Sequence, residues 1–232
     1  MKLAFVYAGQ GSQKVGMGRD FYDQYPEYRA VLDNAGLDFD LKTLTFEGPI
    51  EELSQTRYTQ PCMAAFAVGV TDLLYARGIR PCAAAGLSLG EYSALYAAGV
   101  LDRETVLKTL AFRGRAMEQA AEGLACGMTA VLSLERDKLQ SACDQASELG
   151  VVQICNYNCP GQLVISGEKA AVDRAGELAK ELGAKRCMPL RVSGPFHTRL
   201  MKPAGDALAD YFKTITFHPM ALPVYFNCKG GP

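Results

Sequence analysis

The sequence has few of the features that mark metal proteins or proteins that bind nucleic acid. It contains only two histidines in 232 residues, so a zinc site is not favoured, even around Cys155 and Cys159, and we expect no metal. Lys plus Arg total 24 against 25 for Asp plus Glu. This balance gives no reason to expect general binding to nucleic acid or to an anionic membrane, and an acidic partner would have to meet a local basic patch.

Long apolar runs and targeting segments are also missing. No stretch approaches the roughly 20 apolar residues that are needed to cross a bilayer. The N-terminus reads MKLAFVYAGQGSQ, in which Gly and Gln interrupt the apolar run too early for a signal peptide. The eight cysteines are scattered through apolar stretches of a chain that is too large to need disulfides. We therefore expect reduced cysteines and a cytoplasmic protein without a membrane partner.

The first part of the chain has the pattern of an α/β protein. An apolar run ended by glycine predicts a strand near residues 2–8, and the segment GQGSQKVGMG predicts a loop. Helical segments are predicted at about 20–34 and 50–53, and a long buried helix is predicted to begin at Pro61. The segment at 79–101 then predicts a strand, a tight turn and a helix. A chain of 232 residues with 49% hydrophobic residues can bury a sizeable core, so we expect one domain, or one domain carrying a smaller insert.

The middle of the chain predicts a second subdomain at 124–192. Its segments have the order strand, helix, strand, strand, helix, strand, which matches the ferredoxin-like, split-βαβ arrangement. The predicted fold class is therefore α/β, with an α/β-hydrolase-like larger subdomain that has a parallel sheet. The larger subdomain spans 1–123 and 193–232, and the ferredoxin-like small subdomain is inserted between these two segments.

The turn at 86–90 has the sequence Gly-Leu-Ser-Leu-Gly, a GxSxG motif. A strand is predicted before it and a helix after it, which is the context that a nucleophile elbow needs. Glycines on both sides of Ser88 remove Cβ atoms where the strand and helix backbones would crowd, so the hydroxyl can sit exposed in a sharp bend. Taken alone, the motif is also compatible with a glycine-rich turn that carries an incidental serine, although the nucleophile elbow is the favoured interpretation.

A serine nucleophile needs a base, and histidine is the usual one. His197 lies in SGPFHTRLM, where the second subdomain gives way to the next helix, and a Gly-Pro turn there could present its side chain to a cleft. His218 lies directly before a proline and reads as a structural histidine. His197 is therefore the candidate base, with a hydrogen-bonded residue at a helix start as the alternative interpretation.

Three further positions could serve a reaction at Ser88. The backbone N-H of Leu89, at the start of a helix, would point at a developing oxyanion, and the N-H of Gln10 could provide a second donor. Arg113 lies on the helix after the elbow helix, and a fixed guanidinium binds a carboxylate through two parallel hydrogen bonds. The alternatives are a polar surface turn for Gln10 and a solvated helical arginine for Arg113.

Six segments in register across the whole chain carry a resemblance: YAGQGSQ, TQPCMAAF, GLSLGEYSAL, AFRGRAM, NYNCPGQLVISG and SGPFHTRLMKPA. Together they resemble the malonyl-CoA:acyl carrier protein transacylases of fatty acid synthesis and the related acyltransferase domains of polyketide synthases. The resemblance implies a ping-pong reaction with malonyl-CoA and acyl carrier protein as partners. It implies no cofactor, because the coenzyme A thioester is a substrate.

The resemblance also implies roles for individual positions. Ser88 matches the nucleophile and His197 the base of a Ser-His pair. Seven positions match the family's site in all: Ser88 and His197 as catalytic residues, Gln10 and Leu89 as oxyanion-hole donors, Arg113 as the malonyl carboxylate partner, Asn156 in a supporting place near the cleft, and Phe196 in the malonyl-preferring pattern.

The chain departs from the family pattern in three ways. Leu87 stands where many members have histidine, and Ala8 where many have proline, but neither change removes a catalytic group. Members usually continue well beyond the position of Pro232 and add strand and helix to the main sheet. We therefore expect the chain to lack the C-terminal portion, which would leave an apolar surface uncovered.

Two other functions stay open from the sequence. A serine thioesterase or hydrolase would use water as acceptor, although Arg113 has no purpose in the hydrolysis of simple acyl chains. A truncated, non-catalytic family member would only bind carrier protein. Docking of an acidic carrier protein would need a basic patch, for which the candidates are Lys185, Arg186, Arg191, Arg199 and Lys202.

Overall fold

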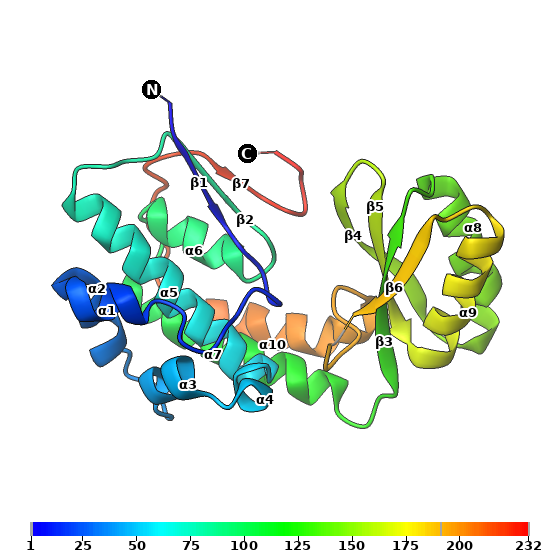
Figure 1. Ribbon diagram of the computed structural model, residues 1–232, viewed down its shortest axis with the longest axis horizontal. Helices are drawn as coiled ribbons and strands as arrows, with labels where there is room; N and C mark the ends of the chain where they lie inside the picture. The colour runs from blue at the N-terminus through cyan, green and yellow to red at the C-terminus, as the bar shows by residue number, and fades with distance from the viewer. Residues whose placement is uncertain (1, 191, 232) are drawn as a thin grey trace. The chain divides into compact units, whose positions relative to one another are not determined.

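The computed structural model describes residues 2–190 and 192–231 and divides into two compact units. One unit comprises Met1–Arg115 and Asp210–Pro232, and the other comprises Ala116–Ala209 (Figure 1). The sequence therefore leaves the first unit and returns to it, as expected for an inserted subdomain. The bounds predicted for the small subdomain, 124 and 192, stay a prediction. Arg191 lies outside the described residues.

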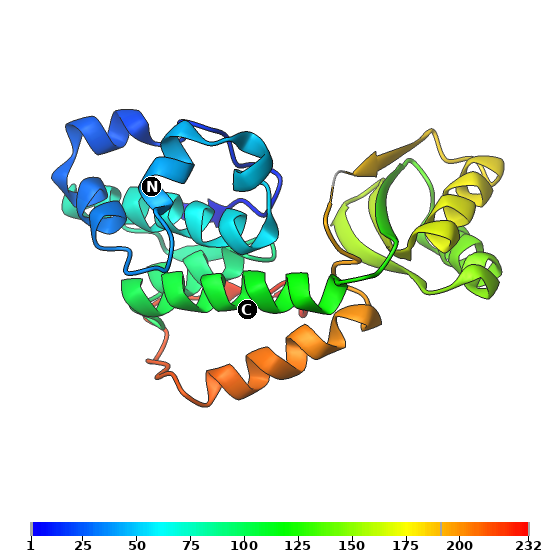
Figure 2. The same ribbon diagram turned by 90° about the horizontal axis from the view of Figure 1, so that it is seen from below.

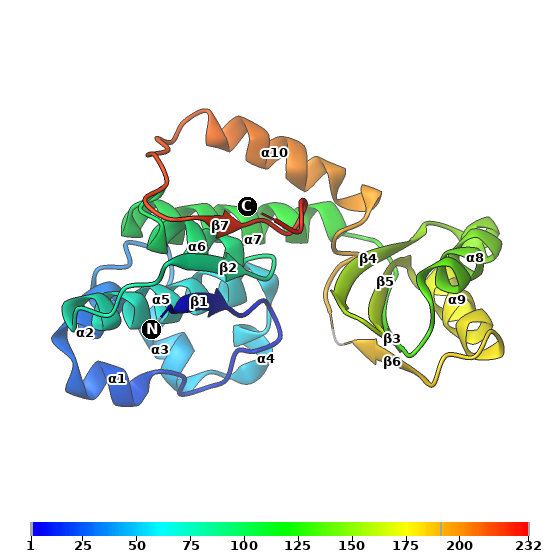
Figure 3. The same ribbon diagram turned by 90° about the horizontal axis from the view of Figure 1, so that it is seen from above.

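The first unit contains a parallel sheet of three strands. They are β1 (Ala4–Tyr7), β2 (Ala83–Gly86) and β7 (Val224–Tyr225), in the order β1-β2-β7 (Figure 3). Tyr7 is in register with Gly86, and Ala85 with Tyr225. Because the strands are parallel, the loops that follow them lie at the same edge of the sheet, where open α/β sheets bind their ligands.

Helices make up most of the remainder of the first unit. They are α1 (Arg19–Gln24), α2 (Pro26–Asp33), α3 (Leu41–Glu47), α4 (Ile50–Leu53), α5 (Thr56–Ala76) and α6 (Gly90–Ala97), with α7 (Arg103–Ala121) continuing past the unit's boundary. Side chains from several elements form one buried core, in which Tyr28 of α2, Val68 of α5 and Leu107 of α7 are fully buried. Removal of this apolar surface from water is the main stabilising term for the unit.

Two predicted helices differ from the observed ones. The helix predicted to begin at Pro61 begins at Thr56, with Pro61 inside it. Proline lacks an N-H and costs a helix one hydrogen bond, but Pro61 and its neighbours are buried, and this packing outweighs the local preference. The helix predicted at 20–34 is two helices, which meet at Tyr25 because proline follows it. Helix α3 was not predicted.

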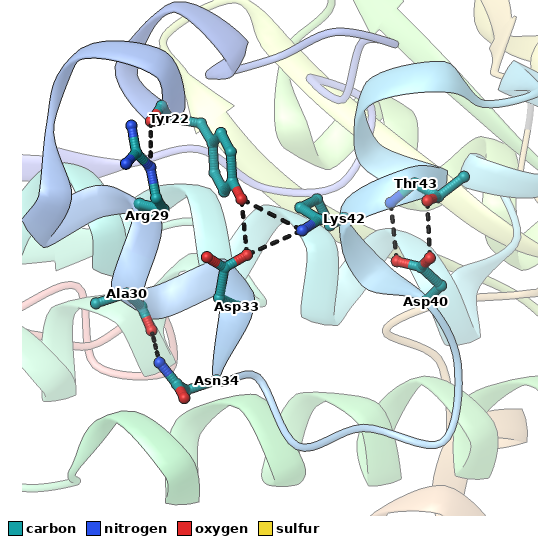
Figure 4. Close-up of polar contacts among 8 residues, drawn as sticks. All are labelled: Tyr22, Arg29, Ala30, Asp33, Asn34, Asp40, Lys42 and Thr43. Atoms are coloured by element: carbon teal, nitrogen blue, oxygen red, sulfur yellow. Dashed lines mark hydrogen bonds and ion pairs between the residues drawn. The ribbon is translucent and has the colours of Figure 1, made fainter.

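Polar contacts on the surface link the first three helices (Figure 4). The Tyr22 hydroxyl donates to the Asp33 carboxylate at 2.8 Å, and the Lys42 ammonium donates to the same carboxylate at 3.0 Å. Asp40 caps α3 by accepting from the Thr43 N-H at 3.0 Å. The hydrogen bonds from Thr43 lower the pKa of the Asp40 carboxyl. Such exposed contacts each contribute little to stability, so they orient helices that the core already holds.

A cavity of about 650 Å³ lies beside β1. Its lining includes Val6 on the strand, Phe21 on α1, and Phe66 and Val70 on α5. Val6 is 79% exposed, and among the described residues β1 has a strand neighbour on one side only. This edge of the first unit therefore presents an apolar surface.

The second unit has the predicted ferredoxin-like order of elements. Its strands are β3 (Cys126–Leu132), β4 (Val152–Cys159), β5 (Gln162–Glu168) and β6 (Arg186–Leu190). Its helices are α8 (Arg136–Ala146), the short η1 (Ser147–Leu149), α9 (Lys169–Glu181) and η2 (Arg199–Met201). Helix α10 (Lys202–Phe212) begins in this unit and ends in the first one. The four strands form an antiparallel sheet in the order β4-β5-β3-β6. Figure 2 shows α8 and α9 on one face of this sheet. The predicted fold class is confirmed.

No helix within the described ranges combines the length and the apolar character that a membrane crossing requires.

Candidate active site

The turn between β2 and α6 is a nucleophile elbow. Ser88 has φ 52°, in the left-handed region that a serine rarely adopts. A Cβ atom on Gly86 would lie 2.0 Å from the carbonyl carbon of Gly90, and one on Gly90 would lie 2.5 Å from the Tyr7 carbonyl oxygen. Only glycine fits at these two positions, so the motif's glycines are required by the close approach of β1, β2 and α6.

The backbone N-H groups of Gln10 and Leu89, both near the elbow, have no protein acceptor among the described residues. The loop that carries Gln10 is tied to the elbow, because the Leu87 N-H donates to the Tyr7 carbonyl at 3.0 Å. The Gln10 side chain donates to the Thr56 hydroxyl at 3.0 Å, which fixes that loop against α5. These are the two donors that the sequence proposed for an oxyanion hole.

Arg113 brings a positive charge to the nucleophile. Its Nη2 atom donates to the Ser88 Oγ at 3.1 Å, and its Nη1 atom donates to the Gln60 Oε1 at 2.9 Å. Arg113 is 9% exposed and Gln60 is fully buried. A Cβ on Gly114 would lie 2.7 Å from the Thr56 carbonyl oxygen, so α7 approaches α5 closely here. That approach positions Arg113 beside Gln60, and the alternative of a solvated helical arginine is wrong.

The surroundings of Arg113 make its charge effective. The guanidinium carbon lies 5.7 Å from the centre of the Tyr92 ring, over its face. Burial lowers the pKa of the guanidinium, and the nearby Tyr92 and Glu91 act in the opposite direction. Arginine nevertheless stays protonated in proteins. A fixed and buried cation therefore faces Ser88, where a carboxylate could bind it through two hydrogen bonds.

His197 lies in a tight turn of the second unit and is exposed. It has φ 61°, and Ser88, Ser133 and His197 are the three non-glycine residues with positive φ in the described chain. Thr198 fixes the turn, because its hydroxyl donates to the Pro195 carbonyl at 2.7 Å and accepts from the Leu200 N-H at 3.3 Å. Strained conformations of this kind gather at functional sites. The pairing of His197 with Ser88 joins the two units and stays a prediction.

The two remaining predicted site residues also belong to the second unit. Asn156 is half-buried at an irregularity of β4, and its side-chain oxygen accepts from the Cys155 thiol at 3.1 Å. Phe196 is 6% exposed, and its ring fills the space where a Cβ on Gly194 would lie. Their roles toward a substrate stay predictions.

The predicted basic patch is described for four of its five members, since Arg191 falls outside the described residues. Lys202 is exposed and pairs with Asp206 at 2.7 Å, one helical turn along α10. That pair reduces the net positive charge that Lys202 could offer a partner. The patch as a docking surface stays a prediction.

The sequence interpretation missed two residues of this site. Gln60, which binds Arg113, lies in the TQPCMAAF segment that carried the family resemblance, but no role was assigned to it. Asn227 follows β7, and its side chain binds the elbow: its Oδ1 accepts from the Ser88 N-H at 2.7 Å, and its Nδ2 donates to the Gly86 carbonyl at 2.7 Å. The available signal was a polar side chain directly after an apolar strand.

Known proteins resemble this chain over nearly all of its length. The model of the family described as "Acyl transferase domain" matches residues 4–230. The malonyl CoA-acyl carrier protein transacylase of Bacillus subtilis is 43% identical over 229 residues, which cover 97% of this chain and 72% of that protein. The corresponding protein of Escherichia coli K12 is also 43% identical, with 97% and 74% covered.

Solved structures show the same fold. A crystal structure of the enzyme abbreviated MCAT from Streptococcus pneumoniae has a TM-score of 0.91 and 50% identity, covering 97% of this chain and 74% of that one. A malonyl-transacylase in complex with a type II polyketide synthase acyl-carrier protein has a TM-score of 0.94 and 40% identity, covering 98% and 74%. The chain thus spans about three quarters of these relatives' length, and it belongs to the acyl transferase domain family.

Proposed function

We propose that this protein transfers a malonyl group from malonyl-CoA to the phosphopantetheine thiol of acyl carrier protein, through an ester on Ser88. The reaction belongs to fatty acid or polyketide biosynthesis and makes the protein an acyltransferase. Family membership supports this function, since the relatives named above are malonyl CoA-acyl carrier protein transacylases. The relative solved with a carrier protein bound supports the second substrate.

The first half-reaction forms the acyl-enzyme. Ser88 Oγ attacks the thioester carbonyl of malonyl-CoA while His197 takes the hydroxyl proton. The N-H groups of Gln10 and Leu89 stabilise the tetrahedral oxyanion, where one such donor is worth about 2.7–4 kcal/mol of barrier. The carbon-sulfur bond then breaks, and His197 returns the proton to the leaving thiolate of coenzyme A.

The second half-reaction regenerates the serine. The thiol of the carrier protein's phosphopantetheine arm attacks the ester carbonyl of malonyl-Ser88, and His197 takes the thiol proton. The oxygen of Ser88 leaves and recovers that proton from His197. The same groups serve both halves, because each half is the reverse of the other with a different thiol.

The buried guanidinium of Arg113, 3.1 Å from Ser88 Oγ, is the observation that carries the proposal. A malonyl group carries a free carboxylate, and this guanidinium is close enough to bind it when the other end of the group is bonded to Ser88. Hydrogen bonds to a charged partner contribute about 1.5–3 kcal/mol each. A serine hydrolase of neutral esters has no use for such a cation, so this arrangement favours the transacylase.

We also place the protein in the cytoplasm. Its eight cysteines are free, and three of them are exposed, which favours a compartment that keeps thiols reduced.

The test is transfer to carrier protein. Purified protein is mixed with malonyl-CoA and carrier protein that bears its phosphopantetheine arm, and the products are identified by mass spectrometry. The proposal expects malonyl-carrier protein, formed in amounts that exceed free malonate. Free malonate as the sole product would identify a hydrolase, and binding of carrier protein without any transfer would identify a non-catalytic family member; each result would contradict the proposal.

A further inference from the structure

Asn227 lies at the carboxyl end of β7, next to the elbow. Tyr225 on β7 is in register with Ala85 on β2, so Asn227 comes level with the residues that follow β2. A turn fixes the backbone there, because the Phe226 N-H donates to the Gly231 carbonyl at 3.0 Å and the Gly230 N-H donates to the Phe226 carbonyl at 2.9 Å. The end of the strand is thereby held against the bend that carries Ser88.

The carboxamide of Asn227 spans the elbow. Its oxygen accepts from the Ser88 N-H and its nitrogen donates to the Gly86 carbonyl, both at 2.7 Å. The two bonds join the residues on either side of Leu87, where the strand ends and the left-handed bend begins. An amide is suited to this task since it offers one acceptor and one donor in a single plane.

Glu91, in the first turn of α6, holds Asn227 in turn. Its Oε1 accepts from the Asn227 backbone N-H at 2.6 Å. The first turn of the elbow helix, the bend and the strand end are therefore joined through one asparagine.

These bonds do more than satisfy polar groups. The Ser88 N-H and the Asn227 N-H lie on the exposed side of the elbow, where water could bind them instead. A side chain in the place of water fixes the position of the Ser88 peptide, which the strained φ of 52° would otherwise allow to relax. The Ser88 N-H is thereby bonded to Asn227 and cannot bind an oxyanion, whereas the N-H groups of Leu89 and Gln10 have no protein acceptor among the described residues.

We propose that Asn227, held by Glu91, is the positioning residue of the nucleophile elbow: it keeps Ser88 in its reactive conformation and fixes which N-H groups face the oxyanion. The inference rests on the proposed function, and it names residues outside the Ser-His pair, the oxyanion donors and Arg113. Asn227 acts through the backbone of Ser88 and touches no substrate.

The first experiment measures the single-turnover rate at which malonyl-CoA acylates Ser88. Asn227→Ala should lower this rate about 10- to 100-fold, because small displacements of reacting groups carry costs of that order. The malonyl-CoA concentration that gives half the maximal rate should not change, since Arg113 is untouched. Cys228→Ala, at the exposed neighbouring position, is the matched control and should keep the rate of the unmodified protein.

Glu91 provides an internal check. Glu91→Gln keeps an oxygen acceptor for the Asn227 N-H and should retain most of the rate, whereas Glu91→Ala should lower it. The double variant Asn227→Ala, Glu91→Ala should be no slower than Asn227→Ala alone, because both residues act through one contact. If the two substitutions lower the acylation rate additively, the proposal is overturned. It is also overturned if they change only the malonyl-CoA concentration that gives half the maximal rate.

Hydrogen exchange of the Ser88 amide tests the contact without any need for activity. Exchange should be faster in Asn227→Ala than in the unmodified protein, and unchanged in Cys228→Ala.

If Asn227→Ala fails to fold, Asn227→Asp serves instead, since it keeps the acceptor for the Ser88 N-H but places an oxygen against the Gly86 carbonyl. Slower acylation of Asn227→Asp supports the proposal, and an unchanged acylation rate overturns it. A protein that takes no malonyl refutes the proposed function alone, and unchanged exchange in Asn227→Ala refutes the positioning role.

Discussion

The two units differ in how their candidate site residues are held. In the first unit, glycines without room for a Cβ and an asparagine that spans the bend fix the position of Ser88. A hydrogen bond to a buried glutamine fixes the side chain of Arg113. In the second unit, His197 is exposed in a turn that Thr198 fixes, and Asn156 is half-buried on a strand. The chemistry of the first unit can therefore be argued from packing, whereas that of the second depends on the family resemblance.

The largest expected effect tests whether the second unit takes part in the chemistry. His197→Ala should lower the rate of Ser88 acylation about 10²- to 10⁴-fold, because that is the usual contribution of a general base. His218→Ala is the matched control, since His218 is the only other histidine. Rapid-quench measurement of the acyl-enzyme gives the rate. Equal rates for His197→Ala and His218→Ala would remove the second unit from the mechanism.

The next effect tests the buried cation of the first unit. Arg113→Ala should lower kcat/KM for malonyl-CoA about 10- to 100-fold, because it removes charge-assisted hydrogen bonds worth about 1.5–3 kcal/mol. Transfer of acetyl from acetyl-CoA, which has no carboxylate, should change little. Arg115→Ala is the control, since Arg115 pairs with Asp38 on the surface. A parallel loss with both thioesters would mean that Arg113 has only a structural role.

Glycine substitutions compare the packing of the two units. Gly86→Ala should lower the free energy of unfolding by about 1–3 kcal/mol or more, because its Cβ would overlap the Gly90 backbone. Gly176→Ala, within α9 of the second unit, should instead raise it by about 0.5–1 kcal/mol, since its Cβ would meet only the Thr129 methyl at 4.0 Å. Urea unfolding followed by circular dichroism measures both. A Gly86→Ala variant with the same free energy of unfolding as the unmodified protein would contradict the steric account of the elbow.

The smallest effect concerns thiol reactivity, with one buried probe in each unit. Burial raises the pKa of the Cys62 thiol in the first unit to about 12, and that of the Cys143 thiol in the second to about 12. A raised pKa means less thiolate at pH 8, so iodoacetamide should modify Cys82, Cys159 and Cys228 first, which are exposed. The fraction of thiolate should grow as the pH approaches 12.

Mass spectrometry of peptides then follows Cys62 and Cys143 separately as urea is added. Each becomes modified when its own unit opens, so the two midpoints compare the stabilities of the units. Modification of Cys62 or Cys143 at pH 8, as fast as that of Cys82, would contradict the burial described for that unit.

Much of the fold could be predicted because its local signals agree with the packing. The ferredoxin-like order follows from strand and helix patterns that alternate over a short stretch. The elbow follows from Gly86 and Gly90, whose spacing reflects a steric requirement. The start of α5 was predicted incorrectly, because Pro61 is a strong local signal for a helix start and the burial that overrides it is a tertiary effect.

The same reasoning explains which site residues were found. Arg113 was proposed from its residue type and the resemblance, but its burial beside Gln60 depends on the close approach at Gly114, which no local pattern announces. Asn227 was missed because it lies 139 residues from the Ser88 N-H that it binds. Contacts of this separation are set by strand order in the sheet, and a single sequence gives that order only indirectly.

The most direct test of the account is the intact mass of the protein after mixing with malonyl-CoA. The account predicts a mass increase of one malonyl group, its absence in Ser88→Ala, and its loss when carrier protein with a free phosphopantetheine thiol is added. The same malonyl adduct on Ser88→Ala, or no adduct on the unmodified protein, would contradict the claim that this serine carries the transferred group.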